Sequence, residues 1–400
     1  MQGNQHRGTN QEEPLIRAVM PELDSIRGLA ILLVLFYHGF FWSYGLAGLS
    51  GISKIMMLIT RSGWLGVNLF FVLSGFLITG ILLNSKSRID YYSRFYTRRA
   101  LRILPLYFAI LPVLALFHLA SWPFLVLSFL YLSNVAPLFG VATGYGVLWS
   151  LAVEEQFYLF WPAVVRCVSD RMLLISAIVV ALVIPLLRGI SFHFGVAEGL
   201  VHYTWFVADG LAMGALLAVL LCKFPPSRAC LGVSAGIAIL FSIMGIVAAV
   251  PFGILTRNRL IGAAFQTSAA NLFFAGGLVL CLLAGTSRWK SLVRIKLLRF
   301  FGEISYGLYL IHVLLFDSYD ALAQSYWPGV AAHGGLAAMW LRFICAGGTA
   351  VSLAYLSRRY FEERFLRLKD KLSFSSRIAP GLRFWTVPAF VSRQRSSKQE

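Results

Sequence analysis

Long apolar segments separated by short polar loops are the feature that most constrains the fold of this chain. A helix needs about 20 apolar residues to cross the hydrocarbon core of a bilayer. Only 13% of the residues are charged, about half of the fraction that is usual in soluble domains. We therefore expect an all-α fold, a polytopic membrane bundle of about ten transmembrane helices. The ten apolar segments are roughly 26–46, 64–84, 103–120, 149–168, 172–190, 204–222, 229–250, 266–285, 300–317 and 336–357.

Residues 124–139 form a shorter apolar segment, which Asn134 and Pro137 interrupt. The distribution of Lys and Arg indicates whether it crosses the membrane. If it does not cross, and the N-terminus is cytoplasmic, 29 of the 35 Lys and Arg residues lie in inner segments, as the positive-inside rule requires. A full span at this point would move the most basic later loops to the outside. We therefore expect a re-entrant or interfacial helix that is buried against protein.

The expected organisation is one transmembrane domain, 23–365, between a cytoplasmic N-terminal tail, 1–22, and a basic cytoplasmic C-terminal tail, 366–400. The first apolar segment is too long for the core of a signal peptide, so we expect a multi-pass protein of the cell (inner) membrane. Basic inner loops account for the net charge of +18, and no nucleic-acid partner is expected. The five cysteines lack paired spacing, so neither a disulfide framework nor a metal site is predicted.

An arginine and a histidine stand out in the first apolar segment, RGLAILLVLFYHGF, which runs from Arg27 past His38. Eleven residues are close to three helical turns, so both side chains share one face with a rise of about 16 Å between them. Ionisable groups inside a span are candidates for function, and a neutral imidazole can act as a general base. The alternative is that Arg27 anchors the helix and His38 only hydrogen-bonds to a neighbour.

Two later spans carry polar side chains at a comparable expected depth. Ser305, Tyr309 and His312 follow one another at i, i+4 and i+7 in the ninth span and therefore share a face. Glu154, in the fourth span, is costly at that depth unless it is paired or reaches water. An imidazole is one partner that it could orient. The alternative for His312 is an interhelical hydrogen bond that only stabilises the bundle.

Four arginines lie close together after the second span, in YYSRFYTRRALRILPLY, at the expected inner membrane face. Guanidinium groups pair bidentately with phosphate, so the cluster predicts a phosphate-binding site. The alternative is positive-inside charge that contacts lipid headgroups. The four residues are Arg94, Arg98, Arg99 and Arg102.

Taken together, the motifs resemble those of the acyltransferase-3 family of integral membrane O-acyltransferases. LDSIRGLAILLVLFYH is similar to the first-span signature of that family. GVNLFFVLSGFLITGIL, RRALRILPLY, LWSLAVEEQFYLFWP and ISYGLYLIH resemble its later landmarks, in the same order, and the resemblance covers about 23–365. It implies functional roles for Arg27, His38, Arg98, Arg99, Arg102, Glu154 and His312.

The resemblance implies an enzyme that moves an acyl group, expected to be acetyl, from cytoplasmic acyl-CoA to a hydroxyl of a carbohydrate. The acceptor would be extracytoplasmic or lipid-linked, such as O-antigen lipopolysaccharide, exopolysaccharide or a similar glycolipid. Some members of the family act on macrolide-like natural products instead. Acyl-CoA, in particular acetyl-CoA, is the implied co-substrate, and neither a bound cofactor nor a metal is expected.

Many members of the family carry a soluble periplasmic hydrolase-like (SGNH) domain at the C-terminus. This sequence ends 43 residues past the tenth expected span, so we expect the standalone form. Such a membrane domain would act on the acceptor directly or with a separate periplasmic partner protein.

In the expected mechanism the arginines hold the phosphates of acyl-CoA, and His38 acts as general base on the acceptor hydroxyl. Glu154 or His312 would orient His38, and Ser74, Tyr309 and His312 are candidate oxyanion or substrate contacts. A covalent acyl-His38 intermediate stays open. The alternatives from other classes are a proton-coupled transporter or flippase and a non-catalytic sensor. The polar motifs show none of the repeat symmetry that many transporters have.

Overall fold

The computed structural model describes residues 14–17, 19–42, 51–328 and 335–371, with the backbone alone for 369–371. Every regular element in these ranges is helical. The longer helices are α1 (Pro21–Phe36), α3 (Gly51–Arg61), α4 (Leu65–Ser85), α5 (Tyr91–Leu116), α7 (Leu148–Cys167), α8 (Asp170–His193), α10 (Asp209–Lys223), α11 (Arg228–Ala249), α12 (Leu260–Gly285) and α14 (Lys296–Tyr326). The shorter helices are α6 (Trp122–Phe129), α9 (Thr204–Val207), α13 (Lys290–Val293), α16 (Gly335–Arg342), α17 (Gly348–Leu356) and α18 (Glu363–Lys371). There are also three π-helical segments in these ranges, η1 (Tyr37–Phe41), η5 (Phe343–Gly347) and η6 (Ser357–Glu362). The described 3₁₀ segments are η2 (Ser62–Trp64), η3 (Ser133–Phe139) and η4 (Val250–Phe252).

Eight helical stretches in the described ranges are long and apolar enough to cross a membrane. The predicted all-α, multi-pass membrane bundle is therefore confirmed. The fourth and sixth predicted spans are helical as well, although they are not among the eight. One of them, α7, carries Glu154, Glu155 and Arg166 among its 20 residues. The other is interrupted at Ala208, which leaves α10 with 15 residues.

The predicted re-entrant or interfacial segment at 124–139 is a pair of short elements. The helix α6 has eight residues, and η3 follows it after a turn in which Tyr131 has a φ of 56°. Neither piece is long enough to cross a membrane. The hydroxyl of Tyr107 on α5 donates a hydrogen bond to the carbonyl of Ser128 at 2.8 Å, so α6 is fastened to the bundle.

Several boundaries differ from the expected ones. Helix α3 occupies a stretch that we expected to be loop, and α5 begins at Tyr91. The arginine cluster therefore lies on the first turns of a helix and not in the loop that follows the second span. Most of the expected tails, 1–22 and 366–400, lies outside the described residues, while 366–371 belong to α18.

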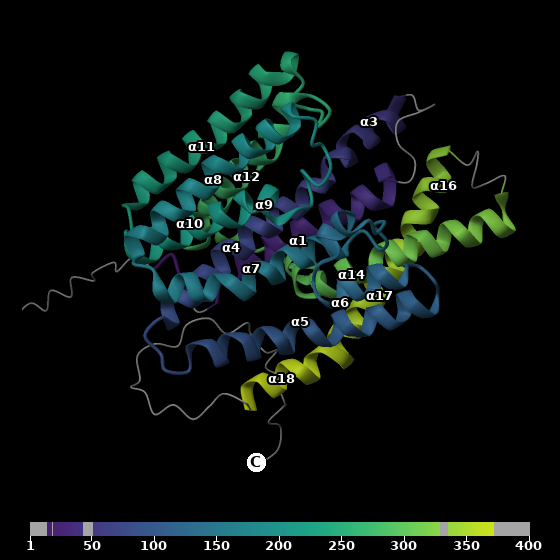
Figure 1. Cartoon of the computed structure of the whole chain (residues 1–400), viewed down its shortest axis with the longest axis horizontal. Helices are drawn as coiled ribbons and strands as arrows, with labels where there is room; N and C mark the ends of the chain where they lie inside the picture. The colour runs from purple at the N-terminus through teal and green to yellow at the C-terminus, as the bar shows by residue number, and fades with distance from the viewer. Residues whose placement is uncertain (1–13, 18, 43–50, 329–334, 372–400) are drawn as a thin grey trace, which may run out of the picture.

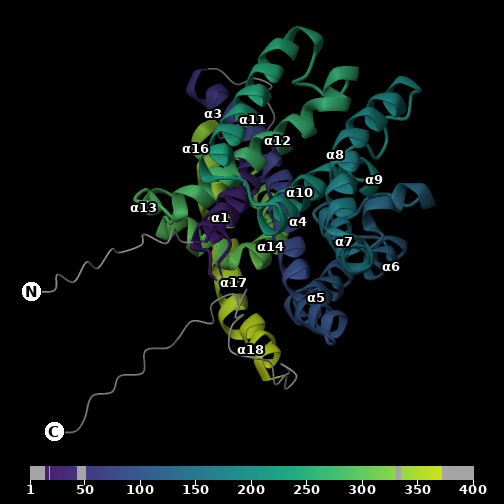
Figure 2. The same cartoon turned by 90° about the vertical axis from the view of Figure 1, so that its left-hand side faces the viewer.

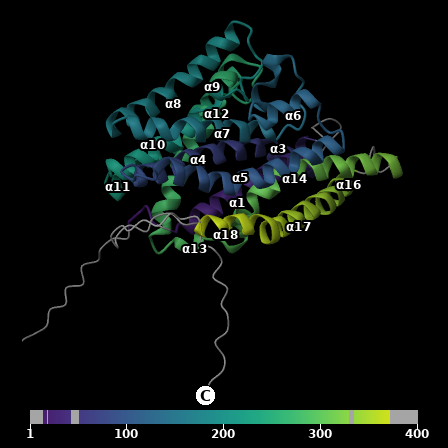
Figure 3. The same cartoon turned by 60° about the horizontal axis from the view of Figure 1, so that its bottom comes forward.

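The helix α1 lies in the middle of the bundle, packed against α14 and α4 (Figure 1). From α4 the packing continues through α10 to α8 and α12, with α11 at the outer edge. Figure 2 shows the short helix α13 beside α1, which it contacts. Figure 3 shows α16, α17 and α18 following one another along one side of the molecule, where α17 packs on α14.

Glycines allow the backbones of α1 and α14 to touch. A Cβ atom at Gly28 would lie 1.8 Å from the carbonyl oxygen of Leu298, and one at Gly302 would lie 2.0 Å from that of Asp24. Small residues permit this close approach between membrane helices, where packing rather than hydrophobic burial drives association. Because both helices rise in the same direction from this crossing, their registers are fixed relative to each other.

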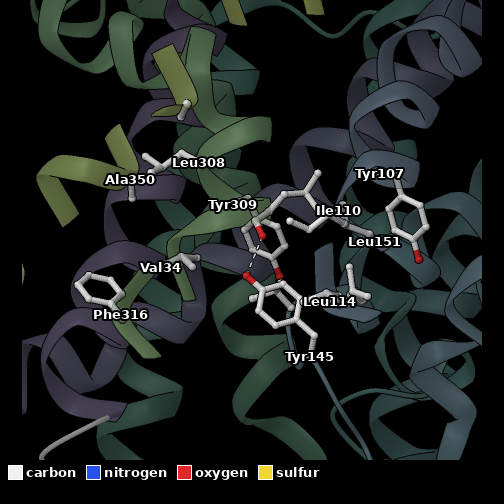
Figure 4. Packing of buried hydrophobic residues seen from close by; sticks show 14 of the residues in the cluster. Val34, Tyr107, Ile110, Leu114, Tyr145, Leu151, Leu308, Tyr309, Phe316 and Ala350 are labelled. Carbon is white, nitrogen blue, oxygen red and sulfur yellow. Dashed lines mark hydrogen bonds between the residues drawn. The ribbon is translucent and has the colours of Figure 1, made fainter. Parts of the chain in front are cut away.

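Tyrosines within the main hydrophobic cluster fasten α14 to the helices around it (Figure 4). Tyr145, which precedes α7, donates a hydrogen bond to the carbonyl of Leu310 at 2.7 Å and accepts one from the backbone N–H of Leu314 at 3.1 Å. Tyr309 lies in the same cluster as Ile110 and Leu151. Buried hydroxyls with partners on neighbouring elements leave α14 little freedom to rotate.

The glycine contact can be tested with one substitution. Gly28→Ala forces the backbones of α1 and α14 apart, because its Cβ would meet a backbone oxygen that cannot move alone. Overpacking of this kind costs about 1–3 kcal/mol, so we expect a clear fall in the thermal unfolding midpoint in detergent. Gly236→Ala on α11 is the matched control, since a Cβ there meets nothing within 4 Å, and alanine favours the helix by about 1 kcal/mol. A midpoint for Gly28→Ala equal to that of the control would contradict the contact.

Candidate active site

Two histidines from distant parts of the chain meet inside the bundle. Nε2 of His312, on α14, lies 3.2 Å from Nδ1 of His38, on η1. His312 is fully buried, whereas His38 keeps part of its surface exposed. The pair predicted from depth alone is therefore in hydrogen-bond contact, and His38 is the member that a substrate could reach.

Backbone carbonyls assign the proton positions of this pair. Nδ1 of His312 lies 3.0 Å and 2.9 Å from the carbonyl oxygens of Leu308 and Tyr309. A carbonyl only accepts, so this nitrogen carries the proton and Nε2 of His312 carries a lone pair. Nδ1 of His38, which also lies 3.1 Å from the carbonyl of Val34, must then donate to His312. In the neutral ring this leaves Nε2 of His38 as the basic nitrogen.

A buried arginine holds the segment that carries His38. Arg342, at the end of α16, donates to the carbonyl of Gly39 at 2.7 Å and to that of His38 at 3.4 Å. Its other side forms a bidentate ion pair with Asp320 of α14, at 2.6 and 2.8 Å. Arg342 is 1% exposed, and its guanidinium lies 4.5 Å from the centre of the Phe316 ring. The η1 segment is thereby tied to the same helix that supplies His312.

A pocket enters the bundle between α1, α4, α5, α7 and α14. We call it the central pocket; it encloses about 1260 Å³ of empty space, including its opening. One part of its wall carries cations and another carries hydroxyl and carboxylate groups. The polar lining residues are Asp24, Arg27, Ser74, Arg99, Arg102, Ser150, Glu154, Tyr158, Ser305, Tyr306 and Tyr309.

Three of the four arginines implied by the resemblance line the central pocket, and Arg98 does not. Arg27 pairs with Asp24 at 2.8 Å. The guanidinium of Arg99 lies 5.2 Å from the centre of the Tyr158 ring. Among the described residues neither Arg99 nor Arg102 forms an ion pair. Because no carboxylate of the described residues contacts either guanidinium directly, this part of the wall can attract an anion.

Glu154 lies in the central pocket rather than against the imidazoles. Its Oε1 accepts a hydrogen bond from the hydroxyl of Ser74 at 2.7 Å, and Ser74 in turn accepts one from the hydroxyl of Tyr158 at 3.2 Å. The structure gives Glu154 no hydrogen bond to His38 or His312. The proton of Ser74 is already committed to Glu154.

Tyr309 connects the central pocket to the histidines. It lines the pocket, and its ring centre lies 5.8 Å from that of His312. Its hydroxyl shares a hydrogen bond with Ser150 at 2.5 Å. Neither His38 nor His312 lines the pocket itself, so Tyr309 stands between the pocket and the pair.

Sequence reasoning missed the π-helical turn at His38 and the partners of two buried arginines. Arg188 pairs with Asp209 at 3.2 Å and donates to Ser268 at 2.6 Å, which joins α8, α10 and α12. Ionisable residues inside spans were the available signal for both arginines. In the described part of the chain no three His, Cys, Asp or Glu side chains are grouped closely enough to hold a metal ion.

Comparison with known proteins adds two relatives. The peptidoglycan O-acetyltransferase OatA of Listeria monocytogenes is 28% identical over 332 residues, which cover 74% of this chain and 49% of that protein. The O-acetyltransferase OatA of Staphylococcus aureus is 27% identical over 344 residues, which cover 76% of this chain and 52% of that protein. The chain thus spans about half the length of the curated relatives that it matches. No solved structure matches it.

The family assignment follows from a match along most of the chain. Residues 20–359 match the acyltransferase-3 family, which is described as an acyltransferase domain. The matched region holds the histidine pair, Arg342 and every lining residue of the central pocket except Val19. The chain therefore belongs to the acyltransferase-3 family of membrane acyltransferases.

Proposed function

We propose that this protein is a membrane O-acetyltransferase that moves an acetyl group from cytoplasmic acetyl-CoA to a hydroxyl of an extracytoplasmic or lipid-linked carbohydrate. The observation that carries the proposal is the contact between His38 and His312 beyond the end of a pocket lined by Arg27, Arg99 and Arg102. The name of the Listeria relative, a peptidoglycan O-acetyltransferase, supports a cell-surface glycan as acceptor.

The proposed orientation places the arginines of the central pocket on the cytoplasmic side. It rests on the charge distribution, since this topology puts 29 of the 35 Lys and Arg residues in inner segments. The chain would then lie in the cell membrane with both termini cytoplasmic. Acetyl-CoA would enter at Arg27, and the acceptor would approach His38 from the other side.

Binding of the donor would use the cations first. Arg99 and Arg102, with Arg27 beside them, would hold the phosphates, because guanidinium groups form bidentate hydrogen bonds with phosphate oxygens. The pantetheine arm would run through the central pocket from Arg27 toward Tyr309. On α1, the rise from Arg27 to His38 is about 16 Å. The thioester would reach the level of the histidine pair past Tyr309.

The chemical step would begin with Nε2 of His38. This nitrogen takes the proton of the acceptor hydroxyl while the hydroxyl oxygen attacks the thioester carbonyl carbon. The tetrahedral intermediate collapses as its C–S bond breaks, and the CoA thiolate leaves with the electron pair. His312 would stabilise the His38 cation, since its Nε2 lone pair accepts the Nδ1 proton of His38. His38 could alternatively accept the acetyl group itself before passing it to the hydroxyl.

Two hydroxyls differ in their fitness to stabilise the oxyanion. Ser74 already donates its proton to Glu154, so it cannot also donate to a developing negative charge. Tyr309 faces Ser150, whose hydroxyl also lies 3.3 Å from the carbonyl of Val147. Either hydroxyl can be the donor in the contact between Tyr309 and Ser150. When Ser150 donates to Tyr309 instead of to the Val147 carbonyl, Tyr309 can turn its own proton to the intermediate. We therefore favour Tyr309.

Substitution of His38 tests the proposed base. We expect His38→Ala to lower the release of CoA thiol from acetyl-CoA in the presence of acceptor by about 10²–10⁴-fold, the usual worth of a general base. The acceptor panel would contain soluble peptidoglycan fragments, a lipid-linked oligosaccharide and a macrolide. His193→Ala, an exposed histidine at the end of α8, is the control. Wild-type turnover in an inserted His38→Ala protein would exclude the proposed role.

Arg342 should act by positioning His38. Arg342→Gln would lose the bidentate ion pair with Asp320 and weaken the hydrogen bonds to the η1 backbone. Displacement of the catalytic base by about 1 Å can lower the rate about 10²-fold. We expect kcat to fall while KM for acetyl-CoA stays within about twofold, because the central pocket does not include Arg342. Arg342→Lys should restore part of kcat. A rise in KM at unchanged kcat would show that the residue serves donor binding instead.

Glu154 should show the opposite pattern. We propose that its carboxylate accepts a hydrogen bond from the pantetheine arm, since it lies in the central pocket and not at the imidazoles. Glu154→Gln is then expected to raise KM for acetyl-CoA about tenfold and to leave kcat nearly unchanged, because the variant loses one charge-assisted hydrogen bond to the donor. A loss of kcat at constant KM would instead place Glu154 in the chemical step.

A further inference from the structure

A second pocket lies where the start of α1 meets the connection between α12 and α13. We call it the basic pocket; it encloses about 1050 Å³ of empty space, including its opening. Its lining residues include four cations and a short stretch of backbone with small side chains. The four cations are Arg17, Arg288, Lys290 and Arg294.

Part of this wall is fixed by a buried carboxylate. Glu22 is 0% exposed and pairs with Arg17 and, at 3.2 Å, with Arg294. Both arginines also donate to the carbonyl of Gly285, at 3.3 and 2.6 Å. A Cβ atom at Gly285 would lie only 2.7 Å from the carboxyl carbon of Glu22, so glycine is needed there. The two guanidinium groups are therefore held in place by the fold.

The remaining two cations supply surplus charge. Arg288 and Lys290 are exposed, and the described side chains include no carboxylate that forms an ion pair with either of them. Among the described residues, Glu22 is the carboxylate that pairs with cations of this pocket. The positive charge of Arg288 and Lys290 adds to this wall and concentrates anions at its mouth. Arginine and lysine together can surround a phosphate group with several donors.

The basic pocket adjoins the central pocket. Val19 lines both of them. Of the two residues that follow it, Met20 lines the central pocket and Pro21 lines the basic pocket. A ligand with two phosphorylated parts could therefore occupy both pockets. CoA has this form, because its adenosine carries a 3′-phosphate in addition to the diphosphate that leads to the pantetheine arm.

We propose that the basic pocket binds the 3′-phosphate of the CoA donor, while Arg99 and Arg102 in the central pocket bind its diphosphate. This inference rests on the proposed function, in that acetyl-CoA is taken as the donor. Arg288 and Lys290 contact the 3′-phosphate, and the Glu22 scaffold holds Arg17 and Arg294 behind them. An anionic lipid headgroup has the same phosphate chemistry and is the competing occupant.

Equilibrium binding of CoA and 3′-dephospho-CoA to purified protein in phosphatidylcholine nanodiscs tests the proposal. The wild type should bind CoA at least tenfold more tightly than 3′-dephospho-CoA, since one charge-assisted hydrogen bond changes affinity by about that factor. The double variant Arg288→Gln/Lys290→Gln should bind the two ligands within about twofold of each other, and its affinity for 3′-dephospho-CoA should be unchanged. Both substitutions leave the Glu22 scaffold intact, and Arg171→Gln, at an exposed residue of α8, should keep the wild-type ratio.

The outcomes separate this inference from the proposed function. If the wild type binds CoA and 3′-dephospho-CoA equally, the inference is wrong while acetyl-CoA remains the donor. If it binds neither, the proposed function fails and the inference falls with it. Equal binding of the two ligands, combined with weaker CoA binding in phosphatidylglycerol nanodiscs, would identify a lipid headgroup as the occupant and overturn the proposal. Retention of the wild-type ratio in the double variant would overturn it as well.

Discussion

The backbone contact between α1 and α14 at Gly28 and Gly302 is the constraint on which the site depends. No side chain separates the two helices there, so neither can slide without moving the other. Ten residues beyond Gly28 and ten beyond Gly302, the helices present His38 and His312 to each other at 3.2 Å. A hydrogen bond between two imidazoles requires that α1 and α14 be aligned along their axes to within about one residue, which corresponds to a rise of about 1.5 Å.

Buried ions complete this framework. An isolated charge in a bilayer costs several kcal/mol, and the structure places Arg188 and Arg342 opposite Asp209 and Asp320 with additional carbonyl acceptors. Arg342 differs from Arg188 because its carbonyl partners belong to a π-helical turn, a feature that is frequent at functional sites. Arg342, whose ion pair with Asp320 connects α16 to α14, therefore also fixes the backbone that carries His38.

Much of the fold could be predicted from the sequence, because apolar length is a strong signal in a membrane protein. All ten predicted segments contain helix, and 124–139 is broken into short pieces. The start of α5 was missed, since a Tyr- and Arg-rich stretch resembles a loop when only hydropathy is considered. The π-helical turn at Tyr37–Phe41 was missed as well, because an inserted residue in the hydrogen-bond ladder leaves no periodic trace in so short a segment.

The candidate site was predictable in its members but not in its pairings. Depth along the spans was enough to group His38 with His312, since both follow the inner face by about the same number of residues. The same reasoning grouped Glu154 with them, yet its hydrogen bond is to Ser74. Depth does not specify which side of α7 faces α14, and that rotation depends on packing between helices that are far apart in the sequence.

The central claim is that the bundle joins a donor on one side of the membrane to an acceptor on the other at His38. Sealed proteoliposomes test it directly, with acetyl-labelled acetyl-CoA trapped inside and a soluble peptidoglycan fragment supplied only outside. We predict that label accumulates on the outside glycan. Acetyl-CoA supplied outside, on the same side as the glycan, should not serve as donor for those protein molecules whose basic pocket faces the lumen. Transfer that occurs only when both substrates share one compartment would contradict it.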